Sequence, residues 1–307
     1  MLTRTDRTSP GSARRRPGGA AMRAHNTGMK VPERLQPLID EGLIDRVVRQ
    51  LTSGKEAMVY VVALGSETFC AKVYKESTHR SFRQAVDYTE NRKVKNSRQA
   101  RAMAKGSRFG RQAQESAWRS AEVHALYRLA AAGVRVPRPI QFHEGVLLME
   151  LVVGEDGHAA PRLNDVEFTP ELARAHHHTL LREVVRMLCA GVVHGDLSEF
   201  NILLGAEGPV IIDLPQAVDA AGNHHAARML SRDVDNLNGF FGRFAPELRE
   251  SGHAGEIWGL YSRGLLDTEV RLTGHFERPA GAVDLDGVMR EIDDARHEEI
   301  ARRLRMT

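Results

Sequence analysis

Hydrophobic and polar positions follow strand-like patterns in the first half of the chain. Short Val-rich runs, separated by turns that contain glycine, predict three successive antiparallel strands at residues 43–51, 57–63 and 68–74. Two more short strands are predicted at residues 140–143 and 146–151. Between these groups, apolar residues at helical spacing predict a helix from about residue 113 to residue 132, with Gly133 as its stop. We therefore expect a five-stranded sheet with one helix.

The second half is dominated by helical spacing. Thr169 can cap a helix and Pro170 fits a first turn, so a long helix is predicted from there to Gly191. Two short apolar strands, at residues 202–204 and 210–212, flank a glycine-containing turn. Further helices are predicted around residues 228–244, 256–263 and 285–304. The order of elements predicts an α+β fold, in which a small sheet and a mainly helical half are joined near residues 150–154.

Composition narrows the class of protein. The chain has 307 residues, of which 42% are hydrophobic and 27% charged, as in a globular protein. Cys70 and Cys189 are too few for a disulfide framework, so we expect a reducing compartment. No apolar run approaches the length of a membrane span, and the N-terminus lacks the apolar core of a signal peptide. The expected location is cytoplasmic, without a membrane partner.

Charge is distributed unevenly, although the whole chain carries a net charge of only +3. Residues 1–30 carry a net charge of +6 and residues 75–111 a net charge of +8, which leaves the rest acidic. The first segment lacks apolar periodicity and is predicted to be a disordered basic tail. Two interpretations of the tail stay open, loose contact with nucleic acid and an extension of little consequence.

One short stretch carries the strongest chemical signal. In residues 194–201, Asp196 is followed five positions later by Asn201, in a loop between a long helix and an apolar strand. Such an Asp can accept a hydroxyl proton in phosphoryl transfer, and the Asn amide oxygen can ligate a metal. Asp213 ends the next apolar strand, where it could approach the same metal. The alternative is that Asn201 and Asp213 only cap a strand and a turn.

The predicted sheet offers residues that could bind phosphate. Lys72 has apolar neighbours on the third strand and could contact nucleotide phosphates, while Glu122 on the following helix could pair with it. Both could instead be exposed to solvent. Residues 52–57 form a turn whose amides and hydroxyls could cover a triphosphate. This turn is not a Walker A loop, because Arg49 stands where that motif has its first Gly and Glu56 where it has Ser or Thr.

Together these segments resemble the RIO family of atypical protein kinases, with the closest likeness to its first branch. The resemblance runs from about residue 42 to residue 244. The motifs that carry it are Ser53-Gly54-Lys55-Glu56-Ala57, Ala71-Lys72-Val73-Tyr74-Lys75, Met149-Glu150-Leu151, Ala160-Pro161-Arg162-Leu163, His194-Gly195-Asp196-Leu197-Ser198-Glu199-Phe200-Asn201-Ile202-Leu203 and Ile211-Ile212-Asp213.

The resemblance implies a two-lobed protein-kinase-like fold, trimmed and without the long activation segment. It divides the chain into a tail at 1–30, an N-terminal lobe at 31–151 with a basic insertion at 75–111, a C-terminal lobe core at 152–245 and a helical extension at 246–307. The insertion matches a basic loop of this family that could contact ribosomal RNA. The alternative is a solvated loop that the acidic remainder of the chain attracts.

The resemblance also implies roles for single residues. Asp196 is the implied catalytic base, and Asn201 and Asp213 are the implied ligands of Mg²⁺, or of Mn²⁺ in its place. Asp213 is in addition a candidate acceptor that forms an aspartyl-phosphate. The implied ATP contacts divide into the phosphate loop, the lysine with its partner, and the adenine edge: Ser53, Lys55, Glu56, Ala57; Lys72, Glu122; Met149, Glu150, Leu151.

The expected function is that of an ATP- and Mg²⁺-dependent serine/threonine kinase with ATPase activity, for which autophosphorylation is expected and the protein substrate stays unidentified. A first alternative is an ATPase switch in ribosomal subunit assembly that contacts the subunit or its RNA through the basic segments. A second is a small-molecule phosphotransferase of the aminoglycoside or choline type. Those enzymes usually have His-Pro-Gly between the Asp and the Asn, whereas this chain has Leu197-Ser198-Glu199-Phe200.

Overall fold

The computed structural model describes residues 14–15, 31–54, 56–75 and 121–276. Several predictions lie outside this part of the chain: most of the basic tail, Lys55, the basic insertion after Lys75, and the helix at 285–304. In the described part, no helix is both long enough and apolar enough to cross a membrane.

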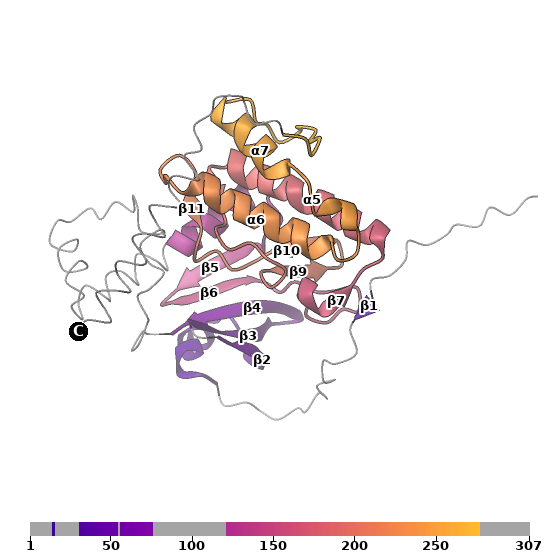
Figure 1. Ribbon diagram of the computed structural model, residues 1–307. Helices are drawn as coiled ribbons and strands as arrows, with labels where there is room; N and C mark the ends of the chain where they lie inside the picture. Colours follow the sequence, from indigo (N-terminus) through magenta and orange to yellow (C-terminus); the bar gives the residue numbers. More distant parts are fainter. Residues whose placement is uncertain (1–13, 16–30, 55, 76–120, 277–307) are drawn as a thin grey trace, which may run out of the picture.

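The first half forms the predicted sheet. It has five antiparallel strands in the order β2-β3-β4-β6-β5 (Figure 1). Their bounds are β2 (Arg46–Ser53), β3 (Ala57–Leu64), β4 (Glu67–Tyr74), β5 (Pro139–His143) and β6 (Val146–Glu150). Each strand overlaps a predicted one, because short Val-rich runs and Gly-containing turns are local signals of strand and hairpin.

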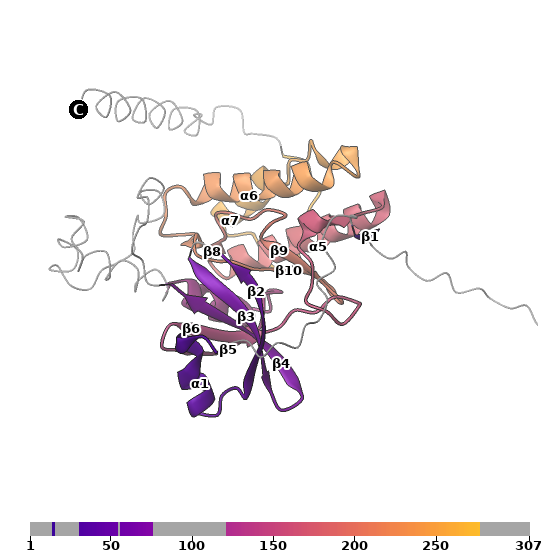
Figure 2. The same ribbon diagram turned by 90° about the horizontal axis from the view of Figure 1, so that it is seen from below.

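Two hydrophobic clusters cover the two faces of this sheet. On one face lie the 3₁₀ turn η1 (Glu33–Leu35) and α1 (Gln36–Asp40), and Figure 2 shows α1 beside the sheet. Their leucines pack against Val73 of β4 and its neighbours. On the other face, Val123 and Leu126 belong to the main core. They lie on the described part of the predicted helix, residues 121–131. The predictions did not include α1, because a five-residue helix with Pro37 near its start has almost no periodicity to detect.

The second half packs helices around two small sheets. The predicted cap is present, since Thr169 Oγ1 accepts a hydrogen bond from the Leu172 amide at 3.3 Å. Figure 1 shows α5, α6 and α7 above the β9–β10 hairpin, on the side away from β2 and β3. The elements are η3 (Leu163–Asp165), β7 (Val166–Glu167), α5 (Pro170–Cys189), β8 (Val192–Val193), β9 (Ile202–Gly205), β10 (Gly208–Ile211), β11 (Val218–Asp219), α6 (Ala226–Phe241), η4 (Pro246–Leu248) and α7 (His253–Ser262).

The connection after Asp213 is short, as expected for a trimmed kinase-like fold. The chain passes through the two-residue strand β11, which pairs with β8, and enters α6 at Ala226. No long segment intervenes between Asp213 and α6, so the structure agrees with the prediction that the activation segment is lacking. The α+β, two-lobed architecture is likewise the predicted one.

One short segment departs from the predicted disordered tail. Arg14–Arg15 form β1, which pairs antiparallel with β7 through Glu167 and Val166 (Figure 1). The structure describes only these two residues of the tail, so its disorder stays a prediction. The backbone pairing joins them to a partner about 150 residues away, which no local pattern around the arginines indicates.

Candidate active site

Lys72 on β4 lies at the centre of the candidate site. Its Nζ is 2.5 Å from Glu122 Oε1 and 2.8 Å from Asp213 Oδ1, so the predicted pair with Glu122 is confirmed. Burial alone would lower the pKa of Lys72, but the charges of Glu122 and Asp213 outweigh it and hold this pKa well above its usual value. The lysine is therefore a fixed positive charge that joins the sheet, a helix and the C-terminal lobe.

Asp213 has the backbone conformation of a constrained position. Its φ is +66°, in the left-handed region that residues other than glycine seldom adopt. Its side chain is 46% exposed and keeps one oxygen against Lys72. Partial burial raises the pKa of Asp213, but the charge and hydrogen bond of Lys72 lower it below its usual value overall. Asp213 therefore stays a carboxylate at neutral pH, ready to ligate a cation.

Asp196 and Asn201 meet in the loop that precedes β9. Asn201 Nδ2 donates to the Asp196 backbone oxygen at 2.8 Å and lies 3.4 Å from Asp196 Oδ2. These contacts turn the amide nitrogen toward Asp196, so Oδ1 is the Asn201 atom left to ligate a metal. The Asn201 backbone oxygen accepts from Ile212 N at 2.9 Å, which places Asn201 beside the residue that precedes Asp213. The predicted trio is thus brought together.

The loop around Asp196 is hydrogen-bonded to a side chain of α6. Asp233, which is 1% exposed, accepts hydrogen bonds from Gly195 N at 2.8 Å and Leu197 N at 2.9 Å. Burial raises the pKa of Asp233, while these amides and the charge of His194 act in the opposite direction. His194 Nε2 lies 3.1 Å from the Ile212 oxygen, which links the loop to the strand end that carries Asp213. Both amides that flank Asp196 are therefore anchored.

Asp233 is a functional residue that the sequence analysis missed. A signal for it exists, because Asp233 lies on the apolar face of α6, between the buried residues Met229, Leu230, Val234 and Leu237. A carboxylate on such a face must have hydrogen-bond partners inside the protein. The sequence therefore marks Asp233 as partnered, but only the fold shows which amides it binds.

The loop between β2 and β3 is closed by a lysine with no predicted role. Lys75 Nζ donates to the Gly54 backbone oxygen at 2.7 Å, and Lys75 N donates to Glu56 O at 2.8 Å. Gly54 N in turn donates to Ala57 O at 2.9 Å. Ser53 is exposed beside this turn, 3.5 Å from Lys75 Nζ. The described part of the predicted phosphate loop is thus a compact turn at the edge of the sheet.

The predicted adenine-edge residues lie at the end of β6, next to the C-terminal lobe. Met149 packs against the main core, while Leu151 is half-buried after the last residue of the strand. The Glu150 amide already donates to Arg138 O at 2.9 Å, so an amide donor for adenine cannot come from Glu150 in this structure. Its carboxylate forms a two-pronged ion pair with Arg135, at 2.8 and 3.1 Å, which the sequence analysis did not predict.

The donor set of Asn201 and Asp213 fits magnesium. One carboxylate and one amide oxygen are hard ligands, and Mg²⁺ in nucleotide sites commonly uses few protein oxygens together with phosphate oxygens and water. The described residues contain no cluster of three or more His, Cys, Asp or Glu side chains that could hold a metal without such help. The structure therefore favours a metal that binds together with a nucleotide.

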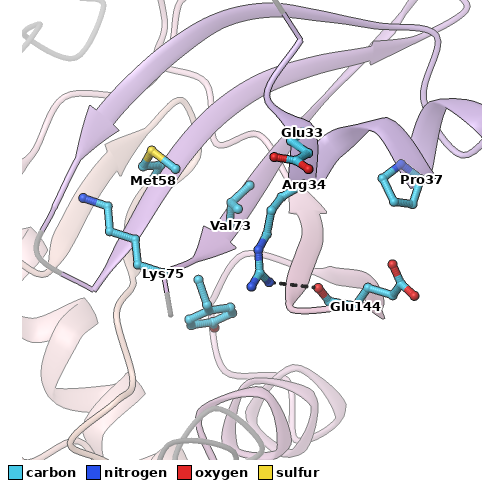
Figure 3. Close-up of a pocket in the computed structure, with 8 residues that line it drawn as sticks. Glu33, Arg34, Pro37, Met58, Val73, Lys75 and Glu144 are labelled. Atoms are coloured by element: carbon cyan, nitrogen blue, oxygen red, sulfur yellow. Dashed lines mark hydrogen bonds between the residues drawn. The ribbon is translucent and has the colours of Figure 1, made fainter. Parts of the chain in front are cut away.

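A separate pocket lies on the other face of the sheet. This cavity of about 710 Å³ is lined by apolar residues of β3 and β4, by Pro37 and by charged residues at its rim. Figure 3 shows Arg34 beside the β5–β6 turn, where its Nη1 donates to the Glu144 backbone oxygen at 3.4 Å. Val73 lines this pocket, whereas its neighbour Lys72 points to the opposite face of the sheet. The pocket shares Lys75 with the turn between β2 and β3, so it borders the candidate active site at that turn.

Comparisons with known proteins agree with this geometry. A RIO domain family model matches residues 58–253. The chain is 37% identical to the RIO-type serine/threonine-protein kinase Rio1 of Haloferax volcanii, over 67% of each chain. It is 31% identical to the human serine/threonine-protein kinase RIO1, over 67% of this chain but 35% of the human protein. It therefore spans only about a third of that longer relative.

Among solved structures, the Rio2 kinase of Chaetomium thermophilum, crystallised as an ADP/Mg²⁺-phosphoaspartate complex, is 22% identical, with a TM-score of 0.48 over 76% of this chain and 73% of that one. The family model covers more than half of the present chain, and its span includes Lys72, Asp196, Asn201 and Asp213. The family model and the identity to the Haloferax volcanii kinase show that the chain belongs to the RIO family.

Proposed function

We propose that this protein is an ATP- and Mg²⁺-dependent serine/threonine kinase of RIO type that also hydrolyses ATP. The observation that carries the proposal is the position of Lys72, which contacts Glu122 and Asp213 at once. A lysine held in this way presents a fixed positive charge where a triphosphate would lie between the two lobes. Membership of the RIO family supports the same reaction.

The reaction follows from the positions of the side chains. Asp196 is exposed at the mouth of the site, so it can accept the proton of an incoming hydroxyl while that oxygen forms a bond to the γ-phosphorus. The bond between the γ-phosphorus and the bridging oxygen breaks, and ADP leaves. Lys72 would stabilise the phosphate charge, and Asn201 and Asp213 would hold Mg²⁺. Bound Mg²⁺ would neutralise charge on the phosphate oxygens.

The acceptor can be a protein hydroxyl, water or a carboxylate, and the proposal includes all three. Transfer to a hydroxyl of this chain is autophosphorylation, and transfer to water is ATP hydrolysis. Transfer to the Asp213 carboxylate would give an acyl-phosphate that water then hydrolyses. The exposed half of the Asp213 side chain supports this third route, because one of its oxygens lies on Lys72 and the other can face the cleft.

The test is a reaction with γ-labelled ATP and Mg²⁺ on the full chain, in which label on protein and released phosphate are both followed. We expect acid-stable label on the wild-type chain or on an added protein, and its loss in Asp196→Asn and in Asp213→Ala. Asp235→Asn is the matched control, because Asp235 is an exposed carboxylate on α6 whose contact is with Ser231. Transfer at the wild-type rate by Asp196→Asn would refute the role of Asp196.

The form of the label separates the acceptors. A hydroxyl phosphoester survives hydroxylamine, whereas an acyl-phosphate on Asp213 is lost to it. If hydroxylamine removes all label while phosphate release continues, the protein is an ATPase and not a kinase. The ribosomal role and the cytoplasmic location stay predictions, and the basic segments on which the former rests lie almost entirely outside the described residues.

A further inference from the structure

Arg135 lies where the N-terminal lobe turns back toward its sheet, and it contacts both lobes. The helix over residues 121–131 carries Glu122, and the chain then turns at Gly133, with φ of +75°. Arg135 follows between Val134 and Val136, both buried in the main core. Its guanidinium meets the Glu150 carboxylate through Nη2–Oε1 at 2.8 Å and Nη1–Oε2 at 3.1 Å. This bidentate geometry fixes direction as well as distance.

The backbone of Arg135 is bound to the C-terminal lobe. Its amide donates to Glu183 Oε2 of α5 at 2.8 Å, and its carbonyl oxygen accepts from Ile211 N of β10 at 2.9 Å. Glu183 is buried, and its other oxygen accepts from Arg186 at 2.6 Å. Because Ile211 lies two residues before Asp213, the same residue that holds the end of β6 also contacts the strand that leads to the metal-binding carboxylate.

Glu150 is held more firmly than a surface glutamate. Besides Arg135, its Oε2 accepts from Arg138 N at 3.0 Å, while its own amide donates to Arg138 O. The two side chains of the ion pair are 34% and 27% exposed. The hydrogen bond from Arg135 lowers the pKa of Glu150, so the pair is ionised throughout the neutral range. Partial burial and two-pronged contact distinguish it from an ordinary exposed ion pair.

We propose that Arg135 is a positioning residue that sets the end of β6, and with it the adenine-binding backbone after Glu150, relative to the C-terminal lobe. This inference rests on the proposed function, since it takes the adenine edge to bind at residues 149–151. Hydrogen bonds to an adenine edge need donor and acceptor positions accurate to a fraction of an ångström. Without the guanidinium, the Glu150 carboxylate keeps its hydrogen bond from the Arg138 amide but loses the ion pair that connects β6 to this junction.

The test measures the affinity for ATP and GTP in excess Mg²⁺ by isothermal titration calorimetry, on the wild-type chain, Arg135→Met, Glu150→Gln and the double variant. We expect each single change to weaken ATP binding about tenfold, and the double change to weaken it no further, because both remove one interaction. GTP has a different base edge and should lose less, so the ratio of the two affinities should fall. A loss from general destabilisation would weaken both nucleotides equally.

Arg174 and Glu247 provide the matched control. Their side chains meet at 2.5 Å between α5 and η4, and Arg174 also lies 3.6 Å from Glu171 on its own helix. Arg174→Met removes an Arg–Glu pair of the same chemistry, and we expect ATP affinity to stay at the wild-type value. Exchange of the charges, Arg135→Glu with Glu150→Arg, should recover part of the affinity that Arg135→Glu alone loses.

Three results would overturn the inference: ATP affinity unchanged in Arg135→Met, equal losses for ATP and GTP, or an equal loss in Arg174→Met. If Arg135→Met does not fold, Glu150→Gln takes its place, because glutamine has the shape of glutamate. The ratio of its ATP and GTP affinities then tests the inference. If the wild-type chain binds ATP and transfers no phosphate, the proposed function fails while this inference is still tested by binding. If the wild-type chain does not bind ATP, both the proposed function and this inference are wrong.

Discussion

Two carboxylate arrangements of this protein hold its candidate site in different ways. Around Lys72, side chains from a strand, a helix and the segment after β10 meet as ions, and Asp213 stays 46% exposed. Below Asp196, the Asp233 carboxylate is 1% exposed and binds two backbone amides of a single loop. The first arrangement joins side chains of two lobes, and the second ties backbone to one helix.

The difference indicates which part of the site depends on the spacing of the two lobes. The loop with Asp196 is held by contacts within the C-terminal lobe. The Lys72 arrangement exists only while the two lobes keep their present distance, because Glu122 and Lys72 come from one lobe and Asp213 from the other. We therefore expect changes at Lys72 to alter the reaction, and changes at Asp233 to alter the free energy of unfolding as well.

The largest effect is expected from Lys72→Met. It removes the charge that would stabilise the phosphates and leaves Glu122 and Asp213 without their shared partner. We expect kcat/KM for ATP to fall about a hundredfold or more, the size typical of the loss of one positioned donor. Steady-state phosphate release measures it, with circular dichroism as the check on folding. A rate within a few fold of wild type would show that Lys72 is not the phosphate contact.

Asp233→Asn should act on both stability and activity. The amide side chain can accept from one of the Gly195 and Leu197 amides but not from both, so one buried donor is left without a partner. We expect the free energy of unfolding to fall by about 1–3 kcal/mol, together with a loss of phosphate transfer. Urea unfolding measures the free energy of unfolding, and Asp235→Asn on the same helix is the control. Unchanged stability would contradict the anchoring role.

Glu122→Gln should have a smaller effect than the loss of Lys72 itself. The glutamine keeps the shape and an acceptor oxygen, but it removes one of the two charges that fix the ammonium group. We expect a decrease of about tenfold in kcat/KM, or about 1.4 kcal/mol, with stability little changed. Comparison with Lys72→Met in the same assay shows whether Glu122 acts through Lys72. In the double variant, the loss should not exceed that of Lys72→Met alone.

The smallest expected effect is a loss of stability when the pH is lowered. His177 and His253 pack together between α5 and α7, with ring centroids 5.7 Å apart. Burial lowers the pKa of both. The pKa of His177 is raised by the hydrogen bond with Asn238 and lowered further by the charges of His253 and His178. The pKa of His253 is raised by the charge of Glu256 and lowered further by the charges of His178 and His275.

The unfolded chain therefore binds more protons than the folded one as the pH falls below about 6.5. We expect full stability above that pH and a decline below it, measured as the melting temperature between pH 8 and pH 5.5. Replacement of His177 by Gln should flatten the decline, whereas His124→Gln, at an exposed position, should not. An equal decline in all three chains would exclude the buried pair as its source.

The strands and the reactive loop were predictable because their signals are local. Short Val-rich runs separated by glycine-containing turns indicated β2, β3 and β4, and Thr169 with Pro170 indicated the start of α5. The family resemblance rested on short motifs in a fixed order, among them Ser53-Gly54-Lys55-Glu56-Ala57 and Leu197-Ser198-Glu199-Phe200-Asn201. Signals of this kind depend on residues a few positions apart, so they can be recognised before any tertiary contact is known.

The ion pairs and hydrogen bonds that position the site residues could not be predicted in the same way. Arg135 with Glu150 and Lys75 with Gly54 join residues that are 15 and 21 positions apart, and Asp233 binds amides almost 40 positions away. Arg, Lys, Glu and Asp are usually exposed to solvent, and their partners here depend on how strands and helices pack. The α1 helix was missed for a related reason, since the role of its Leu38 is visible only against the face of the sheet that it covers.

By itself the sequence determined the kinase-like order of elements, the RIO family and the side chains of the candidate reaction. The tertiary structure decided which of those side chains meet. It placed Lys72 between Glu122 and Asp213, seated the Asp196 loop on Asp233, and joined the end of β6 to the C-terminal lobe through Arg135. The physical reason is that patterns of residue type follow from neighbours along the chain, whereas charge pairs and buried hydrogen bonds depend on neighbours in space.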